Sequence, residues 1–167
     1  MRKYLYAVVL VFTIWFGNAQ TTNQQITPSN PNGIKILHSD FIDKNQNEIP
    51  GAIIFTGNVQ VQHNGVLINC NKAYHYTDED YVKAFGNVIL NQGDTIVMNS
   101  RYAEYNGKTL QAFATGNVNL RSPDSNLTTD TIYFDRNKQE AFYRSWGTIL
   151  NKENTLKSKS GRYYLNN

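Results

Sequence analysis

The sequence predicts an all-β protein, an elongated antiparallel β-jelly-roll or solenoid of stacked, bent hairpins. Three observations predict it: a pattern that recurs about every thirty residues, apolar residues that alternate with polar ones, and turn residues between the segments. Of the 167 residues, 40% are hydrophobic and 13% aromatic, which is enough to form a core. No stretch after residue 19 keeps the apolar spacing of a helix for three turns, so we expect almost no helix.

Residues 1–19 have the features of a cleaved secretion signal. Arg2 and Lys3 precede an apolar run over residues 4–16, and Gly17-Asn18-Ala19 places small residues at the −3 and −1 positions of a signal-peptidase site. The run is shorter than the roughly 20 residues that span a bilayer, which favours cleavage over an uncleaved anchor. Removal of Arg2 and Lys3 leaves 14 of the 16 basic side chains against 13 acidic ones. A nearly neutral mature protein argues against nucleic acid as a partner.

The rest of the chain divides into a flexible linker, residues 20–33, and a repeat domain, residues 34–167. The linker is rich in Thr, Asn, Gln, Ser and Pro. In the repeat domain one tripeptide recurs with steps of 29, 30 and 31 residues: Gly57-Asn58-Val59, Gly86-Asn87-Val88, Gly116-Asn117-Val118 and, more loosely, Gly147-Thr148-Ile149.

Each repeat is predicted to contribute two strands joined by polar turns. A second block follows each of the three Gly-Asn-Val tripeptides, at residues 68–76, 97–105 and 126–134. A less regular copy lies at residues 156–164, and an incomplete copy begins the domain at residues 36–42. The expected turns carry Asn, Asp and Gly, which tolerate left-handed backbone, at residues 63–65, 77–80, 92–94, 106–108 and 136–138.

The strands are predicted to bend. Ile53, Phe55, Gly57 and Val59 share one parity, as a half-buried strand requires, and a glycine in mid-strand indicates a bulge or a sharp bend. In the second block the apolar positions change parity, as the spacing of five from Leu127 to Ile132 shows. We therefore expect V-shaped hairpins that stack with one apolar inner face.

The secretion signal, the Gly-Asn-Val repeats and blocks such as residues 125–134 together resemble the OstA/LptA family of lipopolysaccharide-transport proteins, in particular the OstA-like proteins of the Bacteroidetes. The resemblance runs from about residue 34 to the end of the chain. It implies a jelly-roll whose inner face holds the acyl chains of lipid A, and protomers or related domains joined end to end through open edge strands. The implied partners are lipopolysaccharide, other lipopolysaccharide-transport proteins or further copies, in the periplasm or at the outer membrane. The chain is short for this family, so we expect either a truncated form or a last strand that pairs with another copy.

The inner apolar face predicts a groove for alkyl chains, since burying each methylene contributes about 0.8 kcal/mol. The alternative is that these side chains contact each other in a closed core. The candidate lining residues are Phe55, Val59, Val61, Ile68, Val88, Leu90, Val97, Val118, Leu120, Ile132 and Phe134. Lys72, Arg101 and Asp130 occupy equivalent places in successive blocks, where they either meet lipid phosphates or sugars at a rim or simply face solvent.

The sequence gives little support for a disulfide framework, a metal site or a catalytic site. The lone Cys70 excludes a disulfide framework, a cysteine-based zinc site and an iron–sulfur cluster. Residues 43–47 resemble the start of a calcium-binding loop, but Glu48 and Ile54 stand where that loop needs Gly and Glu, so we expect a turn. His38, His63 and His75 lack zinc-site spacing, and no Gly-x-Ser-x-Gly elbow or phosphate-binding loop is present. We therefore expect no metal, no cofactor and no enzymatic activity.

Together with the resemblance, the apolar inner face implies a periplasmic protein that binds lipopolysaccharide, shelters lipid A acyl chains and bridges toward the outer membrane. The alternative is a secreted structural β-solenoid or adhesin-like module with a closed core and no ligand. A third candidate is a periplasmic chaperone that binds peptides by strand addition. The width of the interior distinguishes the first two, because a carrier needs room for hydrocarbon.

Overall fold

The computed structural model describes residues 32–93 and 95–164, which form 12 strands and no helix. The predicted signal peptide, residues 1–19, and residues 20–31 of the predicted linker lie outside the described residues. Within the described ranges, no helix has the length and apolar character needed to cross a membrane. The prediction of an all-β fold is confirmed.

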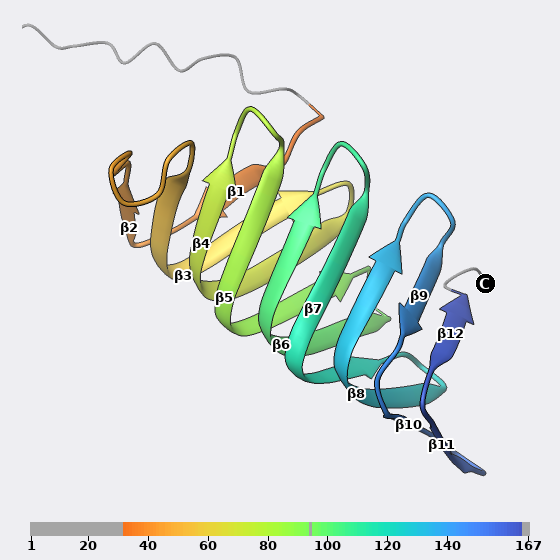
Figure 1. Ribbon diagram of the computed structural model, residues 1–167. Helices are drawn as coiled ribbons and strands as arrows, with labels where there is room; N and C mark the ends of the chain where they lie inside the picture. Colours follow the sequence, from red (N-terminus) through yellow and green to blue (C-terminus); the bar gives the residue numbers. More distant parts are fainter. Residues whose placement is uncertain (1–31, 94, 165–167) are drawn as a thin grey trace, which may run out of the picture.

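All the strands belong to one antiparallel sheet (Figure 1). Its main path runs β1-β3-β4-β5-β6-β7-β8-β10-β11, while β2 pairs with β3, β9 with β8, and β12 with β9. The strand bounds are β1 Lys35–His38, β2 Phe41–Asp43, β3 Ile53–His63, β4 Val66–Tyr76, β5 Tyr81–Gln92, β6 Ile96–Asn106, β7 Gln111–Arg121, β8 Ser125–Asp135, β9 Glu140–Tyr143, β10 Gly147–Asn151, β11 Thr155–Ser158 and β12 Gly161–Tyr164. The sequence-predicted turns fall between these strands.

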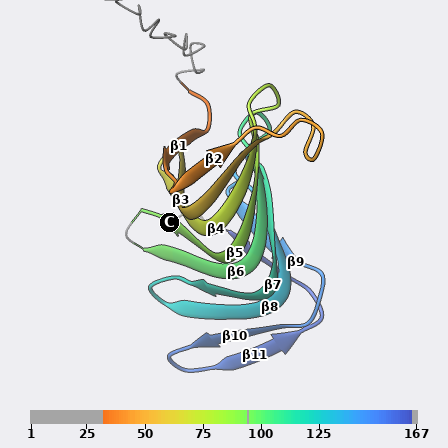
Figure 2. The same cartoon turned by 90° about the vertical axis from the view of Figure 1, so that its left-hand side faces the viewer.

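The six long strands β3–β8 each bend once, so the sheet folds into two walls that meet along a line of corners (Figure 2). The first wall consists of residues 41–43, 53–56, 72–76, 81–85, 102–106, 111–115, 131–135, 140–143 and 161–164. The second wall consists of residues 35–38, 59–63, 66–70, 88–92, 96–100, 118–121, 125–129, 147–151 and 155–158. The ends of the walls opposite the corners are called the mouth.

The corners are made by the repeated Gly-Asn pairs. Gly57, Gly86 and Gly116 have φ values of 80°, 70° and 82°, a region that glycine enters without steric cost. The register shifts at each of these points, since two residues of the glycine strand oppose one of its neighbour. A Cβ on Gly116 would lie 2.9 Å from the Cβ of Arg101. The predicted bulge and bend are confirmed, and close approach of the neighbouring strand adds a second reason for glycine.

The core lies between the walls, and its side chains become larger from the corners toward the mouth. Next to the corners, the first wall presents a row of small residues, Ala73, Ala84, Ala103 and Ala114, paired in register across four strands. They share one buried cluster with Val59, Val88 and Val118 of the second wall. Larger side chains such as Leu90, Met98 and Leu120 follow toward the mouth. Small residues at the apex let the two walls approach each other closely.

The register corrects two sequence-based alignments by one residue. Lys72 pairs with Phe85, which pairs with Tyr102, so Lys72 is level with Tyr102 and not with Arg101. Asn71 is the counterpart of Arg101, because each lies beneath the corner glycine of the next strand. The predicted equivalence of Lys72, Arg101 and Asp130 is therefore wrong at its first member.

The same slip misplaced Val97. Ile68 pairs with Leu90, and Leu90 with Met98. Met98 therefore holds the inward position expected of Val97, and it is 1% exposed. Val97, which pairs with Asn91 and Arg121, faces away from the interior because successive side chains of a strand alternate between faces.

Candidate functional site

The interior between the walls brings together ten of the eleven predicted lining residues, all except Val97. Eight of them belong to the buried cluster and are at most 6% exposed: Phe55, Val59, Val61, Ile68, Val88, Val118, Leu120 and Ile132. Leu90 and Phe134 are partly buried and pack against this cluster. Both walls contribute, and Met98 of β6 belongs to the same cluster, so the apolar surface runs across all six bent strands.

The interior is closely packed. Two small cavities remain near the mouth: the Phe134 cavity, about 30 Å³, and the Tyr143 cavity, about 20 Å³. Ile96 lines both, so they are neighbours. A water molecule needs a cavity of roughly 10–15 Å³, so each holds at most a few waters. The side chains fill the interior in this closed state, and an alkyl chain enters only if the walls separate.

A polar clasp closes the mouth beside the Phe134 cavity. Nδ1 of His63, in the second wall, lies 2.7 Å from the hydroxyl oxygen of Tyr105, in the first wall, and both residues are buried. Arg136, in the turn after β8, donates to the Tyr105 hydroxyl at 3.4 Å and to the carbonyl oxygen of Asn64 at 3.0 Å. Burial raises the pKa of Tyr105, partly offset by Arg136, so its hydroxyl stays neutral. These four residues, His63, Asn64, Tyr105 and Arg136, are called the clasp.

Two further contacts join the tips of the walls. At the N-terminal end, the backbone N–H of Ile34 donates to Oδ1 of Asp80 at 2.8 Å, and Ile34 is part of the core. At the C-terminal end, the Tyr163 hydroxyl donates to Oγ of Ser122 at 3.5 Å beside the Tyr143 cavity. The mouth is therefore closed by separate polar contacts rather than by continuous sheet.

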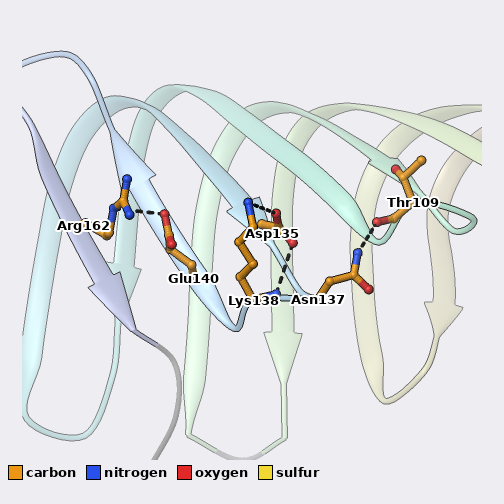
Figure 3. A network of polar contacts seen from close by, with 6 residues as sticks. All are labelled: Thr109, Asp135, Asn137, Lys138, Glu140 and Arg162. Atoms are coloured by element: carbon orange, nitrogen blue, oxygen red, sulfur yellow. Dashed lines mark hydrogen bonds and ion pairs between the residues drawn. The ribbon is translucent and has the colours of Figure 1, made fainter.

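Two ion pairs lie near the mouth end of the first wall. Nε of Arg162 on β12 lies 3.1 Å from Oε1 of Glu140 on β9, and Lys138 lies 3.3 Å from Asp135 (Figure 3). The Asn137 side chain donates to the carbonyl oxygen of Thr109 in the neighbouring turn at 2.8 Å. The Asn137 contact joins two neighbouring turns of the first wall, and the Arg162–Glu140 pair joins β12 to β9.

The outer face of the first wall carries a ladder of six aromatic rings. Successive centroids are 4.7–6.0 Å apart, in the order Tyr74, Phe85, Tyr102, Phe113, Tyr133 and Phe142. Lys72 lies 5.1 Å from the Tyr74 ring centroid and Arg144 lies 5.2 Å from that of Phe142. Cross-strand ring pairs and cation–π contacts stabilise a sheet. These contacts are expected to keep the first wall together as a unit, so any separation of the walls should hinge at the corners and open the mouth.

Among the described residues, both ends of the sheet are open edges, and apolar side chains gather there. At the N-terminal edge Phe41 and Ile42 of β2 are 71% and 69% exposed. At the C-terminal edge Leu156 of β11 and Tyr164 of β12 are 58% and 60% exposed. Within the described residues β1, β2, β11 and β12 each pair on one side only. Unpaired apolar edges are templates for pairing with another chain.

Oδ1 of Asn45 accepts hydrogen bonds from the backbone N–H groups of Asn47 and Glu48, so the calcium-loop-like segment forms a turn, as expected. In residues 32–93 and 95–164, no three His, Cys, Asp or Glu side chains come together at one point.

The clasp is not among the features that the sequence predicts. His63 stood in a predicted hairpin turn, and its partner Tyr105 lies 42 residues away. The repeat predicts which strands are neighbours within the sheet. It carries no signal for how the tips of two facing walls meet.

The fold is similar to that of a solved structure, LptH from Pseudomonas aeruginosa, described as the LptA homologous periplasmic component of the conserved lipopolysaccharide transport device. The match has a TM-score of 0.53 and 14% sequence identity, and covers 64% of this chain and 78% of the LptH chain. No curated protein matches the sequence. The sequence model of the OstA-like protein family matches residues 32–167, which includes the whole predicted repeat domain, residues 34–167. This chain belongs to the OstA-like protein family.

Proposed function

We propose that this protein is a non-enzymatic periplasmic carrier in lipopolysaccharide transport. It shelters the acyl chains of lipid A between its two walls on their way to the outer membrane. Family membership and a fold like that of LptH support this role. The observation that carries it is the apolar interior, which receives residues from every bent strand and ends at two open edges.

Acyl chains enter by separating the walls at the mouth. Each hydrogen bond across the mouth is worth a net 0.5–1.5 kcal/mol, whereas burying one methylene contributes about 0.8 kcal/mol. One or two methylenes therefore offset each bond that opens. Core residues such as Leu90 and Leu120 exchange contacts with each other for contacts with the chain, so the interior stays apolar throughout.

The open edges supply the bridging step. Strand pairing between the C-terminal edge of one subunit and the N-terminal edge of another joins the interiors end to end. The exposed apolar side chains at both edges support such pairing, because they become covered on assembly. The partners are further copies of this chain or related domains of lipopolysaccharide-transport proteins.

Leu90 and Ile89 provide a matched test of the groove. They are adjacent on β5, but Leu90 packs against the core and lines the Phe134 cavity, while Ile89 is 38% exposed. A photo-crosslinking residue placed at Leu90 in cells is expected to give a lipopolysaccharide adduct, and one at Ile89 is not. Adducts from Ile89 alone, or from neither position, contradict the carrier function.

One observation favours the alternative of a structural β-solenoid without a ligand, namely the small size of both cavities. Hydrogen exchange of the purified mature protein separates the two functions. In a carrier, lipid A changes the exchange of backbone amides in β5 and β6. Exchange becomes faster while the walls are parted, or slower once the lipid is bound between them. A scaffold shows identical exchange with and without lipid.

A further inference from the structure

Arg136 is a partly buried cation at the mouth that forms no ion pair with a carboxylate. The ion pairs among the described residues are His38–Asp40, Lys138–Asp135 and Arg162–Glu140. Arg136 donates only to neutral oxygens, the Tyr105 hydroxyl and the Asn64 carbonyl. Its charge is half-buried and is not balanced by a carboxylate.

The guanidinium also has a donor to spare. Nε of Arg136 is buried and has no hydrogen-bond partner among the described residues. A buried donor without an acceptor is unfavourable, and few remain in a native structure unless a ligand or water completes them. The closed clasp therefore leaves part of the binding capacity of Arg136 unused.

Arg136 stands where an apolar cavity meets the mouth. It lines the Phe134 cavity together with Ile68, Leu90, Ile96 and Phe134. A cation at the opening of an apolar cavity matches an amphiphile that has an acidic group next to its alkyl chains. The planar guanidinium binds phosphate through two parallel hydrogen bonds, which an ammonium group cannot do.

We propose that Arg136 is the residue that recognises the phosphate of the bound lipid. When the walls part, an alkyl chain takes the Phe134 cavity and the phosphate takes the N–H groups released from Tyr105 and Asn64, together with Nε–H. The clasp thus holds the phosphate-binding residue in a closed arrangement until a lipid arrives. This inference rests on the proposed function, since it names the headgroup chemistry that the same groove selects.

The test compares lipid A with lipid A from which the phosphates have been removed. Affinities of the mature protein are measured for both, using displacement of an apolar fluorescent dye. Arg136→Gln is expected to lower the affinity for phosphorylated lipid A about tenfold, the loss of a charge-assisted contact, and to leave the dephosphorylated form unchanged. Arg136→Lys is expected to restore part of the loss, because it keeps the charge without the planar fork.

Arg121→Gln is the matched control. Arg121 is an exposed arginine at the end of β7, paired with the outward-facing Val97. It is expected to change neither affinity more than about twofold, because an exposed charge contributes little. Unchanged binding of the dephosphorylated lipid also verifies that each variant is folded.

The outcomes separate this inference from the proposed function. An equal loss for both lipids on Arg136→Gln assigns Arg136 a structural role and overturns the inference, as does no loss for either. Inorganic phosphate is expected not to compete with lipid A; competition at a similar concentration would make this a free-anion site and would also overturn it. If the wild-type protein binds neither lipid, the proposed function itself fails.

Discussion

The hydroxyl oxygen of Tyr105 and Nδ1 of His63 lie 2.7 Å apart, and this contact joins the two walls at their open side. The two rings also pack against each other, with centroids 5.4 Å apart. The strands that carry them, β6 and β3, are not neighbours in the sheet. The contact therefore holds the walls together independently of the backbone ladder.

Tyr105→Phe is expected to keep the ring contact and remove the hydrogen bonds to His63 and Arg136. Stability in urea unfolding should fall by about 1 kcal/mol, and lipid A should bind several-fold faster in stopped-flow measurements, because the mouth opens more readily. Tyr133→Phe is the control, since Tyr133 is 37% exposed on the outer face of the first wall. Slower binding by Tyr105→Phe would contradict the assignment of the clasp as a barrier to entry.

Gly116→Ala tests the corner, with Gly65→Ala as its control. The two glycines have φ values of 82° and 78°, but a Cβ would meet Arg101 at Gly116 and nothing within 4 Å at Gly65. Gly65→Ala should cost about 1–2 kcal/mol for the left-handed backbone alone. Gly116→Ala should cost at least about 1 kcal/mol more, because the neighbouring strand must move. Equal costs in urea unfolding would show that the close approach is unimportant.

His75→Leu tests the pH dependence of stability. Burial lowers the pKa of His75 below its ordinary value of 6.5, and Asp80 partly opposes this shift. As the pH falls below about 6.5, the unfolded chain binds a proton that the folded protein resists, so the folded state loses stability. The variant cannot be protonated there and should lose less stability between about pH 8 and about pH 5.5.

Comparing His75→Leu with wild type also cancels the effect of Glu104, which changes stability with pH in the opposite direction. Burial raises the pKa of Glu104, whose carboxylate accepts hydrogen bonds from Tyr81 and Tyr102, so its protonation favours the folded state as the pH falls. Glu104 is present in both proteins, and its effect cancels in the difference. Parallel pH profiles from urea unfolding would rule out His75 as a source of acid sensitivity.

Cys70 is expected to be an unreactive thiol. Burial raises its pKa from 9.0 to about 11, and its Sγ–H donates to the carbonyl oxygen of Lys72 at 3.3 Å. Two pKa units mean about 100-fold less thiolate, the reactive form, before access is considered. Labelling with a thiol reagent should be more than 100-fold slower in the folded protein than in urea. An added Asp124→Cys in the exposed bend between β7 and β8 provides the control, and comparable rates at the two cysteines would show that Cys70 is accessible.

The repeat made most of the fold predictable. Gly57, Gly86 and Gly116 indicate the positions of the corners. The parity of Phe55, Val59 and Val61 predicts which face of the first strand in a repeat points inward. The inner face of the second strand does not follow from residue type, because blocks aligned by residue type are one residue out of register in the sheet. The spacing of five from Leu127 to Ile132 recurs from Ile68 to Ala73 and from Met98 to Ala103, and it places Met98 rather than Val97 inside.

The contacts between the walls were not predictable in this way. Repeat spacing encodes neighbours within a sheet, which recur every unit, but the clasp joins β3 to β6 and to the turn after β8 once only. Its residues carry no common motif. How closely the facing walls pack depends on the row of alanines beside the corners. That these alanines form a row becomes evident only when the register of the strands is known.

Because of the repeated corners, the length of the molecule can change without a change in what its interior binds. One more unit of about thirty residues adds two strands, and strands lie about 4.8 Å apart. Duplicating a unit would lengthen the molecule by about 10 Å at constant cross-section. Because each corner depends only on the adjacent strand, natural selection can adjust the distance spanned by copying a segment of the gene, without redesigning what is held inside.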